Sequence, residues 1–329
     1  MTRVIAFLVA ALFLAPPAEA ADRFVFGTNW KAEAEHGGFY QALAEGRYAK
    51  YGLDVTIREG GPQVNHNQLL AAGVLDAAMI SNNAEGLNFL KNDIPMVTVA
   101  AFFQKDPQVL LAHPGSSVRS IPQMKGRPIM ISADSRDTWW RFFELRFGFD
   151  ESQIRRYTFN LAPFLVNEDA IQQGYVTSEP FMALREGVKA KVFLIADTGW
   201  PAYSTLVTVS RELAARKPSV VQRFLNASIE GWYSYLYGDP GPGNRLIRKT
   251  NPEMPDALIA YGIAKMKEYG IVDSGDALKL GIGAMTKERL TVFFDAMARA
   301  GVYPADMDHL SAFDLRFVNK RHGLATRPR

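Results

Sequence analysis

Short apolar runs alternate with segments of helical spacing between residues 24 and 102. The apolar or alternating runs predict four strands, at 24–28, 53–57, 77–80 and 96–102. The segments between them predict helices at 39–51, 67–73 and 85–91. Strands and helices that alternate in this way are typical of an α/β fold with a largely parallel sheet.

The same style repeats on a smaller scale between residues 113 and 200. Strands are predicted at 129–132, 155–159 and 192–196, and helices at 138–147 and 168–173. Two similar apolar strands, at 109–112 and 206–209, flank this segment. We therefore expect a chain that leaves one domain, builds a second and returns, with residues 21–110 and 207–329 in lobe 1 and residues 111–206 in an inserted lobe 2.

The C-terminal third of the chain is predicted to be helical. Apolar side chains share one face over 218–236, 257–269 and 287–300, which predicts three amphipathic helices. The first of them should stop at the Gly- and Pro-rich run 238–243.

The N-terminus has the pattern of a secretory signal peptide. Arg3 precedes an apolar run over 4–15, and the triplet Ala18-Glu19-Ala20 has the small residues of a cleavage site. The alternative is a buried N-terminal helix or a membrane anchor, although the run is shorter than the roughly 20 residues that span a bilayer. We expect cleavage before Ala21 and, in a Gram-negative cell, a periplasmic protein.

Composition excludes several classes of function. The formal net charge of +3 gives no reason to expect a nucleic acid or an acidic membrane surface as partner. The absence of Cys from the 329 residues rules out disulfides, thiolate metal sites and cysteine nucleophiles. The signatures of serine hydrolases and phosphate-binding loops are missing, and the five His are scattered without metal-ligand spacing. We expect a binding protein without metal or cofactor rather than an enzyme.

Ligands of open α/β sheets bind at the carboxyl ends of the strands. The loops at these ends are rich in aromatic and polar side chains, which is the usual make-up of a small-molecule cleft. Several of them have a structural role as the alternative: Trp30 as a core residue, His36 as a helix cap, and Asn82 and Asn83 as hydrogen-bond partners of the backbone. The candidate ligand-binding residues are Asn29, Trp30, Glu35, His36, Tyr40, Ser81, Asn82, Asn83, Asp134, Ser135, Tyr175, Glu179, Trp200 and Tyr203.

Motifs along nearly the whole chain resemble the periplasmic substrate-binding proteins of ABC importers. The branch indicated includes thiamine-pyrimidine binders and yeast-type pyrimidine synthases, with alkanesulfonate, taurine and nitrate binders as wider relatives. The motifs are Asn29-Trp30, His36-Gly37-Gly38-Phe39-Tyr40, Tyr51-Gly52-Leu53-Asp54-Val55, Leu75-Asp76-Ala77, Lys125-Gly126-Arg127, Gly174-Tyr175, Glu179-Pro180-Phe181 and Gly283-Ala284-Met285-Thr286.

This resemblance implies a type II periplasmic-binding fold, with two lobes joined by hinge strands at 109–112 and 206–209. It implies a monomer that captures a small ligand by closing its lobes and delivers it to a membrane permease. A flat pyrimidine ring would stack on aromatic side chains and be read by polar ones. The stacking candidates are Trp30, Tyr175, Trp200 and Tyr203, and the polar candidates are Asn29, Asn82, Asn83 and Glu179.

Besides another aromatic or heterocyclic small molecule as ligand, three alternatives to a pyrimidine binder remain at this point. A sulfonate or nitrate binder could use Ser81 and Ser135 near helix starts, although Glu35, Asp134 and Glu179 would repel an anion. An exported ligand-sensing domain is the second. The synthase is disfavoured, because the stretch 79–86 holds neither the Lys nor the His that those enzymes use, and their Cys cluster is absent.

Overall fold

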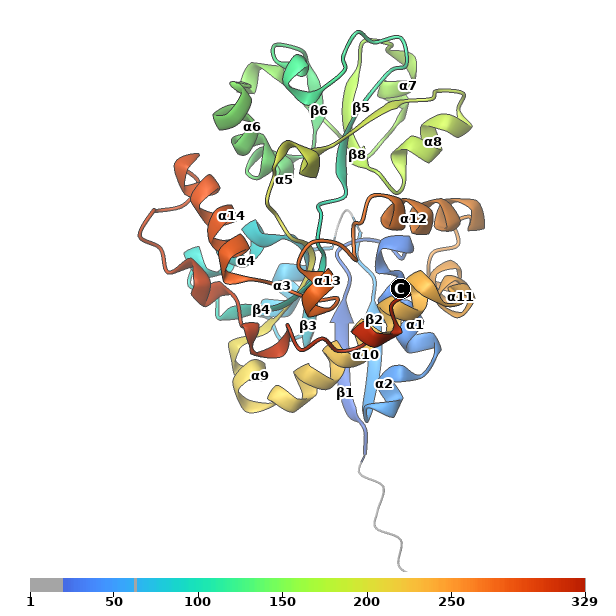
Figure 1. The fold of residues 1–329 in the computed structure, drawn as a ribbon, viewed down its shortest axis with the longest axis vertical. Coiled ribbons are helices and arrows are strands. Elements are labelled where there is room, and N and C mark those ends of the chain that lie inside the picture. The colour runs from blue at the N-terminus through green and yellow to red at the C-terminus, as the bar shows by residue number, and fades with distance from the viewer. Residues whose placement is uncertain (1–19, 62–63, 329) are drawn as a thin grey trace, which may run out of the picture.

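The computed structural model describes residues 20–61 and 64–328, and the signal peptide predicted at 1–20 lies outside this range except for Ala20. Within the described residues the chain forms two five-stranded sheets, each covered by helices (Figure 1). Lobe 1 is the sheet that contains the N-terminal strand, together with its helices, and it fills the lower part of Figure 1. Lobe 2 is the other sheet with its helices.

The sheet of lobe 1 consists of β1 (Asp22–Gly27), β2 (Leu53–Arg58), β3 (Ala77–Asn82), β4 (Met96–Phe103) and β10 (Ser204–Ser210). Their order is β2-β1-β3-β10-β4. β1 pairs in parallel with β2 and β3, whereas β10 runs antiparallel to β3 and β4. The strands predicted in this part of the chain are confirmed to within two residues, because buried apolar residues define them.

The sheet of lobe 2 consists of β5 (Gln108–Ala112), β6 (Ile129–Ile131), β7 (Ile154–Arg156), β8 (Ile171–Tyr175) and β9 (Lys191–Leu194). Their order is β7-β6-β8-β5-β9. The helix predicted at 168–173 is wrong, because residues 171–175 form β8. This strand pairs with β6 on one side and β5 on the other, and these ladders override a polar local sequence.

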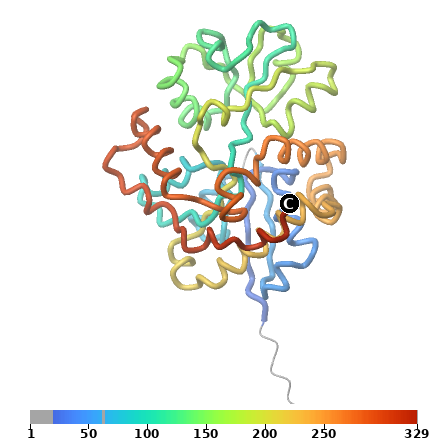
Figure 2. The backbone as a smooth tube through the Cα atoms, viewed as in Figure 1, coloured from blue at the N-terminus to red at the C-terminus, as the bar shows by residue number. Residues whose placement is uncertain are grey.

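The chain crosses between the lobes twice, at residues 104–107 and 195–203, as Figure 2 lets the reader follow. β5 lies wholly in the second sheet and β10 wholly in the first. The predicted lobe boundaries at 110/111 and 206/207 therefore fall inside strands, a few residues after each crossing. The predicted hinge strands are inner strands of the two sheets, and each directly follows a crossing.

Helices cover both sheets (Figure 1). The helices predicted at 218–236, 257–269 and 287–300 are confirmed to within one residue as α10, α12 and α14, whereas α11 was not predicted. Lobe 1 carries α1 (Gly37–Ala44), α2 (Arg47–Lys50), α3 (His66–Ala71), α4 (Asn83–Lys91), α9 (Arg211–Arg216), α10 (Pro218–Tyr237), α11 (Gly241–Thr250), α12 (Asp256–Glu268), α13 (Ala277–Leu280) and α14 (Lys287–Arg299). Lobe 2 carries α5 (Ala133–Arg136), α6 (Trp139–Phe147), α7 (Ala162–Val166) and α8 (Glu179–Arg185).

The helix predicted at 39–51 is divided into α1 and α2. Gly46 lies between them with a φ of 66°, a left-handed conformation that Gly adopts without strain. None of the helices in the described part of the chain has the length and apolar character needed to cross a membrane.

The close approach of α1 and α10 depends on three glycines. A Cβ atom on Gly37 would overlap the ring of Tyr235, and one on Gly38 would overlap the indole of Trp232. A Cβ on Gly231 would overlap the carbonyl oxygen of Gly38. The Gly-Gly pair of the His-Gly-Gly-Phe-Tyr motif therefore serves helix packing.

Gly38→Ala should destabilise the protein, because the new methyl group has no space between α1 and α10. Overpacking of this kind costs about 1–3 kcal/mol. Gly115→Ala is the matched control, since a Cβ at Gly115 meets nothing within 4 Å. The free energy of unfolding in urea measures both, and equal stability of the two variants would contradict this packing.

Candidate functional site between the lobes

The lobes touch along a seam formed by loops at the carboxyl ends of their strands. The ring centroids of Trp30 in lobe 1 and Phe159 in lobe 2 lie 5.1 Å apart. Thr177 Oγ1 of lobe 2 donates a hydrogen bond to Glu35 Oε1 of lobe 1. We call this region the interlobe seam and define it by Trp30, Glu33, Glu35, Tyr157, Phe159, Tyr175, Thr177 and Glu179.

The lobe 1 side of the seam is set by a short 3₁₀ helix, η1 (Ala34–His36), that leads into α1. α12 packs on η1 through Gly262, where a Cβ would come within 2.8 Å of the Ala34 Cβ. This close packing buries Glu35, which is 6% exposed. Glu33 directly precedes η1 and is partly buried.

The lobe 2 side of the seam is organised by Glu179, the first residue of α8. Its carboxylate accepts hydrogen bonds from the Tyr175 amide at 2.7 Å and the Tyr157 hydroxyl at 3.2 Å. Gly174 leaves room for this side chain, because a Cβ there would lie 2.9 Å from the Glu179 Cβ. The predicted residues Tyr175 and Glu179 therefore lie together at the seam.

Carboxyl groups dominate the electrostatics of the seam. Burial raises the pKa of Glu35 to about 7, and the nearby Glu179 adds to the effect. Burial also raises the pKa of Glu33 well above its ordinary value, reinforced by Glu35 and Glu179. Among the described residues, no Lys or Arg forms an ion pair with any of the three. The seam is thus acidic without basic compensation.

A second carboxyl site lies beside the seam on α4. Glu85 accepts hydrogen bonds from the Ser81 amide at 2.8 Å and from Asn67 Nδ2 at 3.1 Å. Burial raises the pKa of Glu85, and the negative charge of Asp134 in lobe 2 raises it further. Asp134 itself is exposed. Glu85 of lobe 1 and Asp134 of lobe 2 are therefore close enough at this second site for their charges to interact.

Polar side chains of lobe 1 connect the strand ends to each other. Asn29 Nδ2 donates to Ser81 Oγ at 3.1 Å, and His36 Nε2 lies 3.3 Å from Asn29 Oδ1. His36 and Tyr40 are each 2% exposed, so these two predicted contacts lie inside lobe 1. Burial lowers the pKa of His36 to about 3, which keeps its imidazole neutral at physiological pH.

Three of the polar residues predicted to contact a ligand form hydrogen bonds with other protein groups in this structure. Asn82 Oδ1 caps α4 by accepting from the Ala84 amide, and Asn83 Oδ1 accepts from the Tyr203 amide. Ser135 Oγ bonds to Ser132 Oγ and Gln108 Oε1. Each forms bonds within its own lobe or to the second crossing.

The two predicted stacking residues of the second crossing are enclosed by protein. The Trp200 indole packs against Phe142 and Phe293, and its Nε1 donates to Asp106 Oδ2 at 3.1 Å. The Arg289 guanidinium covers the Tyr203 ring, 4.1 Å from its centroid. Trp200 is 2% exposed and Tyr203 is fully buried, which leaves Trp30 and Tyr175 as the predicted aromatics at the seam.

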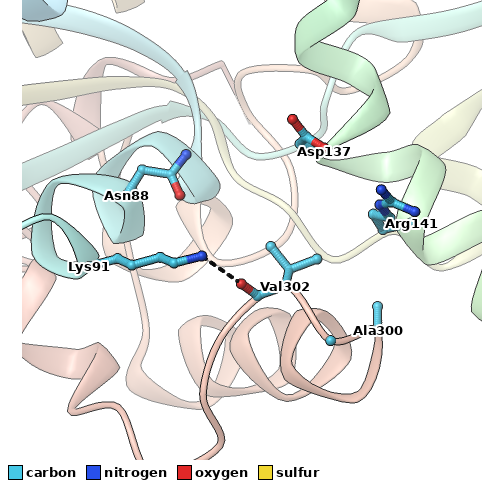
Figure 3. Close-up of a pocket in the computed structure, with 7 residues that line it drawn as sticks. Asn88, Lys91, Asp137, Arg141, Ala300 and Val302 are labelled. Carbon is cyan, nitrogen blue, oxygen red and sulfur yellow. Dashed lines mark hydrogen bonds between the residues drawn. The ribbon is translucent and has the colours of Figure 1, made fainter.

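A cavity of about 540 Å³ opens between the lobes where α4 and the end of α14 face α6 (Figure 3). Lys91 of α4 donates to the Val302 carbonyl at 3.1 Å on its lobe 1 side, and Arg141 of α6 lies on its lobe 2 side. Arg141 is already paired with Glu144 and Glu151. The lining is Asn88, Lys91, Asp137, Arg141, Ala300, Gly301 and Val302, and it contains none of the predicted ligand-binding residues.

The prediction missed five residues of this region: Glu33, Glu85, Tyr157, Phe159 and Thr177. Tyr157 and Phe159 follow β7, which ends at Arg156, three residues before the end predicted for it. The rule that ligands bind at the carboxyl ends of strands could have found them. Glu33 lies two residues before Glu35 in the same loop. Glu85 lies three residues after the end of β3 and bonds to Ser81 and Asn67 of its own lobe. Thr177 gains its partner Glu35 only because the lobes meet, which no local pattern indicates.

Known proteins similar in sequence to this chain include the members of one family and two curated binding proteins. The family described as NMT1/THI5 like matches residues 33–241. The riboflavin-binding protein RibY of Chloroflexus aurantiacus is 23% identical over 291 residues, which cover 85% of this chain and 81% of that protein. The formylaminopyrimidine-binding protein of Halalkalibacterium halodurans is 25% identical over 281 residues, covering 78% of this chain and 81% of that protein.

Comparison with a solved structure identifies the fold. The periplasmic aliphatic sulphonate binding protein SsuA of Escherichia coli superposes with a TM-score of 0.67 at 14% identity, covering 90% of this chain and 92% of that one. The α/β periplasmic-binding-protein fold implied by the sequence resemblance is therefore confirmed.

Glu35→Gln should flatten the pH dependence of stability. Because burial raises the pKa of Glu35 from an ordinary 4.5 to about 7, the folded chain keeps a proton that the unfolded chain releases. The stability from this group is complete below about pH 4.5 and is lost as pH rises through about 7. The fall in the free energy of unfolding between about pH 5 and about pH 8 should shrink in the variant.

Glu186→Gln removes an exposed carboxyl and is the matched control. It should keep the pH dependence of the unaltered protein. The same slope in all three proteins would show that Glu35 is not buried in its protonated form.

Proposed function

This chain belongs to the NMT1/THI5-like family, and we propose that it is the solute-binding component of an ABC importer, specific for a small aromatic nitrogen heterocycle. It is exported through the N-terminal signal peptide and works as a monomer in the periplasm. It catalyses no reaction: the ligand is captured between the lobes and handed to a membrane permease.

The acidic interlobe seam is the observation that carries the choice of ligand. Glu33, Glu35 and Glu179 approach one another from two lobes without a basic partner among the described residues. Such a site has no cation to balance a sulfonate or nitrate anion, and an anion would oppose ionisation of its carboxyls further. A ring amine or a protonated ring nitrogen donates hydrogen bonds to these carboxyls and, when charged, favours their ionised form. The two curated relatives are named for binding riboflavin and formylaminopyrimidine, both nitrogen heterocycles, which supports the same class.

The aromatic residues of the seam supply the second half of recognition. Trp30, Phe159 and Tyr157 form a chain of rings, with successive centroids 5.1 Å apart. Trp30 is half-buried and Phe159 is 53% exposed, so both are accessible from the seam. A flat ligand that separates Trp30 from Phe159 would stack on both lobes at once, and each aromatic pair adds about 0.5–1.5 kcal/mol beyond area burial.

This arrangement explains how binding would drive closure. Without ligand, bringing the lobes together desolvates carboxyl groups, which opposes the closed state. A ligand that donates hydrogen bonds to these groups offsets that cost in the closed state alone. A ligand that binds one of two conformations more tightly shifts the population toward that conformation, so this ligand would favour the closed state.

Thermal unfolding with added aminopyrimidines, riboflavin, taurine and nitrate tests the ligand class. A ligand at about 100 times its dissociation constant should add about 2.7 kcal/mol of stability. We expect this from a heterocycle and not from taurine or nitrate. Stabilisation by taurine or nitrate alone would refute the heterocycle assignment.

Substitutions at the seam test the location. Trp30→Ala and Glu33→Gln should each abolish the ligand-induced shift while the ligand-free protein still unfolds cooperatively. Glu186→Gln, an exposed carboxyl of lobe 2, is the matched control and should keep the full shift. If both seam variants retain the affinity of the unaltered protein, the ligand binds elsewhere.

A further inference from the structure

One side chain of lobe 1, Arg289 of α14, holds both chain crossings. Its Nη2 donates to the carbonyl oxygen of Gln104 at 2.5 Å, and this residue begins the first crossing. Its Nε donates to the Pro201 carbonyl and its Nη2 to the Ala202 carbonyl, both at 2.9 Å. These two residues end the second crossing. The planar guanidinium offers several donors in a rigid fork, which suits it to three fixed acceptors.

Arg289 is itself held in place by Tyr203, the last residue of the second crossing, and its neighbours. The guanidinium carbon lies 4.1 Å from the centroid of the Tyr203 ring. The Tyr203 hydroxyl donates to Asp276 Oδ2 at 2.5 Å and accepts from the Thr286 amide at 3.0 Å. All of these partners belong to lobe 1 or to the end of the second crossing, so Arg289 is a fixed point on lobe 1.

The first crossing changes its attachments between Lys105 and Asp106. The amides of Gln104 and Lys105 both donate to the carbonyl of Ile271 in lobe 1, at 2.7 and 3.1 Å. From Asp106 onward the attachments are to lobe 2. Asp106 Oδ1 accepts from the Gln108 amide of β5, and the Pro107 carbonyl accepts from the Val176 amide at 2.9 Å.

The second crossing changes from bonds with lobe 2 to bonds with lobe 1 between Trp200 and Pro201, next to the point where the first crossing does so. Trp200 Nε1 donates to Asp106 Oδ2, which joins the two crossings on their lobe 2 side. The Trp200 indole lies between Phe142 of lobe 2 and Phe293 of lobe 1, with ring centroids at 5.3 and 5.2 Å. Pro201, the next residue, is already bonded to Arg289.

We propose that Arg289 is the hinge anchor of this protein: it fixes Gln104, Pro201 and Ala202 on lobe 1 and confines the bending to Lys105–Asp106 and Trp200–Pro201. The two bending points lie side by side and are coupled by the Asp106–Trp200 hydrogen bond. Lobe motion is then rotation about one short axis rather than bending spread over both crossings. This inference rests on the proposed function only in that it takes the lobes to open and close.

The distance between two spin labels measures the effect directly. The chain has no Cys, so Lys249→Cys on α11 and Arg185→Cys on α8, both exposed, label one site on each lobe. In the ligand-free protein we expect one narrow distance distribution. Adding Arg289→Gln should broaden it and shift it to longer distances, because the crossings lose three charge-assisted bonds to lobe 1.

Arg299→Gln removes an exposed Arg from the end of the same helix and should leave the distribution unchanged. An unchanged distribution in a folded Arg289→Gln variant overturns the proposal. If Arg289→Gln does not fold, Arg289→Lys is judged by the same criterion, since it keeps the charge but loses the fork. Failure of the proposed function would appear separately, as the absence of any heterocycle-induced thermal shift in the unaltered protein.

Discussion

The cost of placing carboxyl groups between two lobes is the constraint on which the rest of this structure depends. Glu33 and Glu35 enter the seam from lobe 1 and Glu179 enters from lobe 2, and the pKa of both lobe 1 groups is raised by burial. In a protein interior an ionised group is stable only with a partner. The contact between the lobes is therefore conditional, and a hydrogen-bond donor brought by a ligand would complete it.

The packing of lobe 1 holds these groups in position. Gly37, Gly38 and Gly231 allow α1 and α10 to approach closely, and Gly262 lets α12 press on η1. Because a packed interior transmits small displacements, the position of Glu35 depends on contacts between helices far apart in the sequence. Because each lobe is rigid, motion of one lobe relative to the other is confined to the points where the bonds between the crossings and that lobe end.

Much of the fold was predictable from local pattern, because strands and amphipathic helices follow the burial of their own residues. The strands of lobe 1 and the helices α10, α12 and α14 are examples. β8 was mistaken for a helix because its Gln172 and Gln173 are polar yet buried by pairing on both sides. Trp200 and Tyr203 were assigned to a ligand by residue type, whereas their neighbours Phe293 and Arg289 come from a helix about 90 residues later.

The sequence by itself determined the α/β class and the family resemblance and predicted an inserted lobe, since periodicity and short motifs are local properties of the chain. It also predicted Trp30, Glu35, Tyr175 and Glu179 as ligand contacts, and these four lie near strand ends where the lobes meet. Only the tertiary structure decided that carboxyl groups from two lobes share one desolvated seam. It alone decided that Arg289 holds both crossings, because burial and the direction of a side chain depend on partners that the local sequence does not contain.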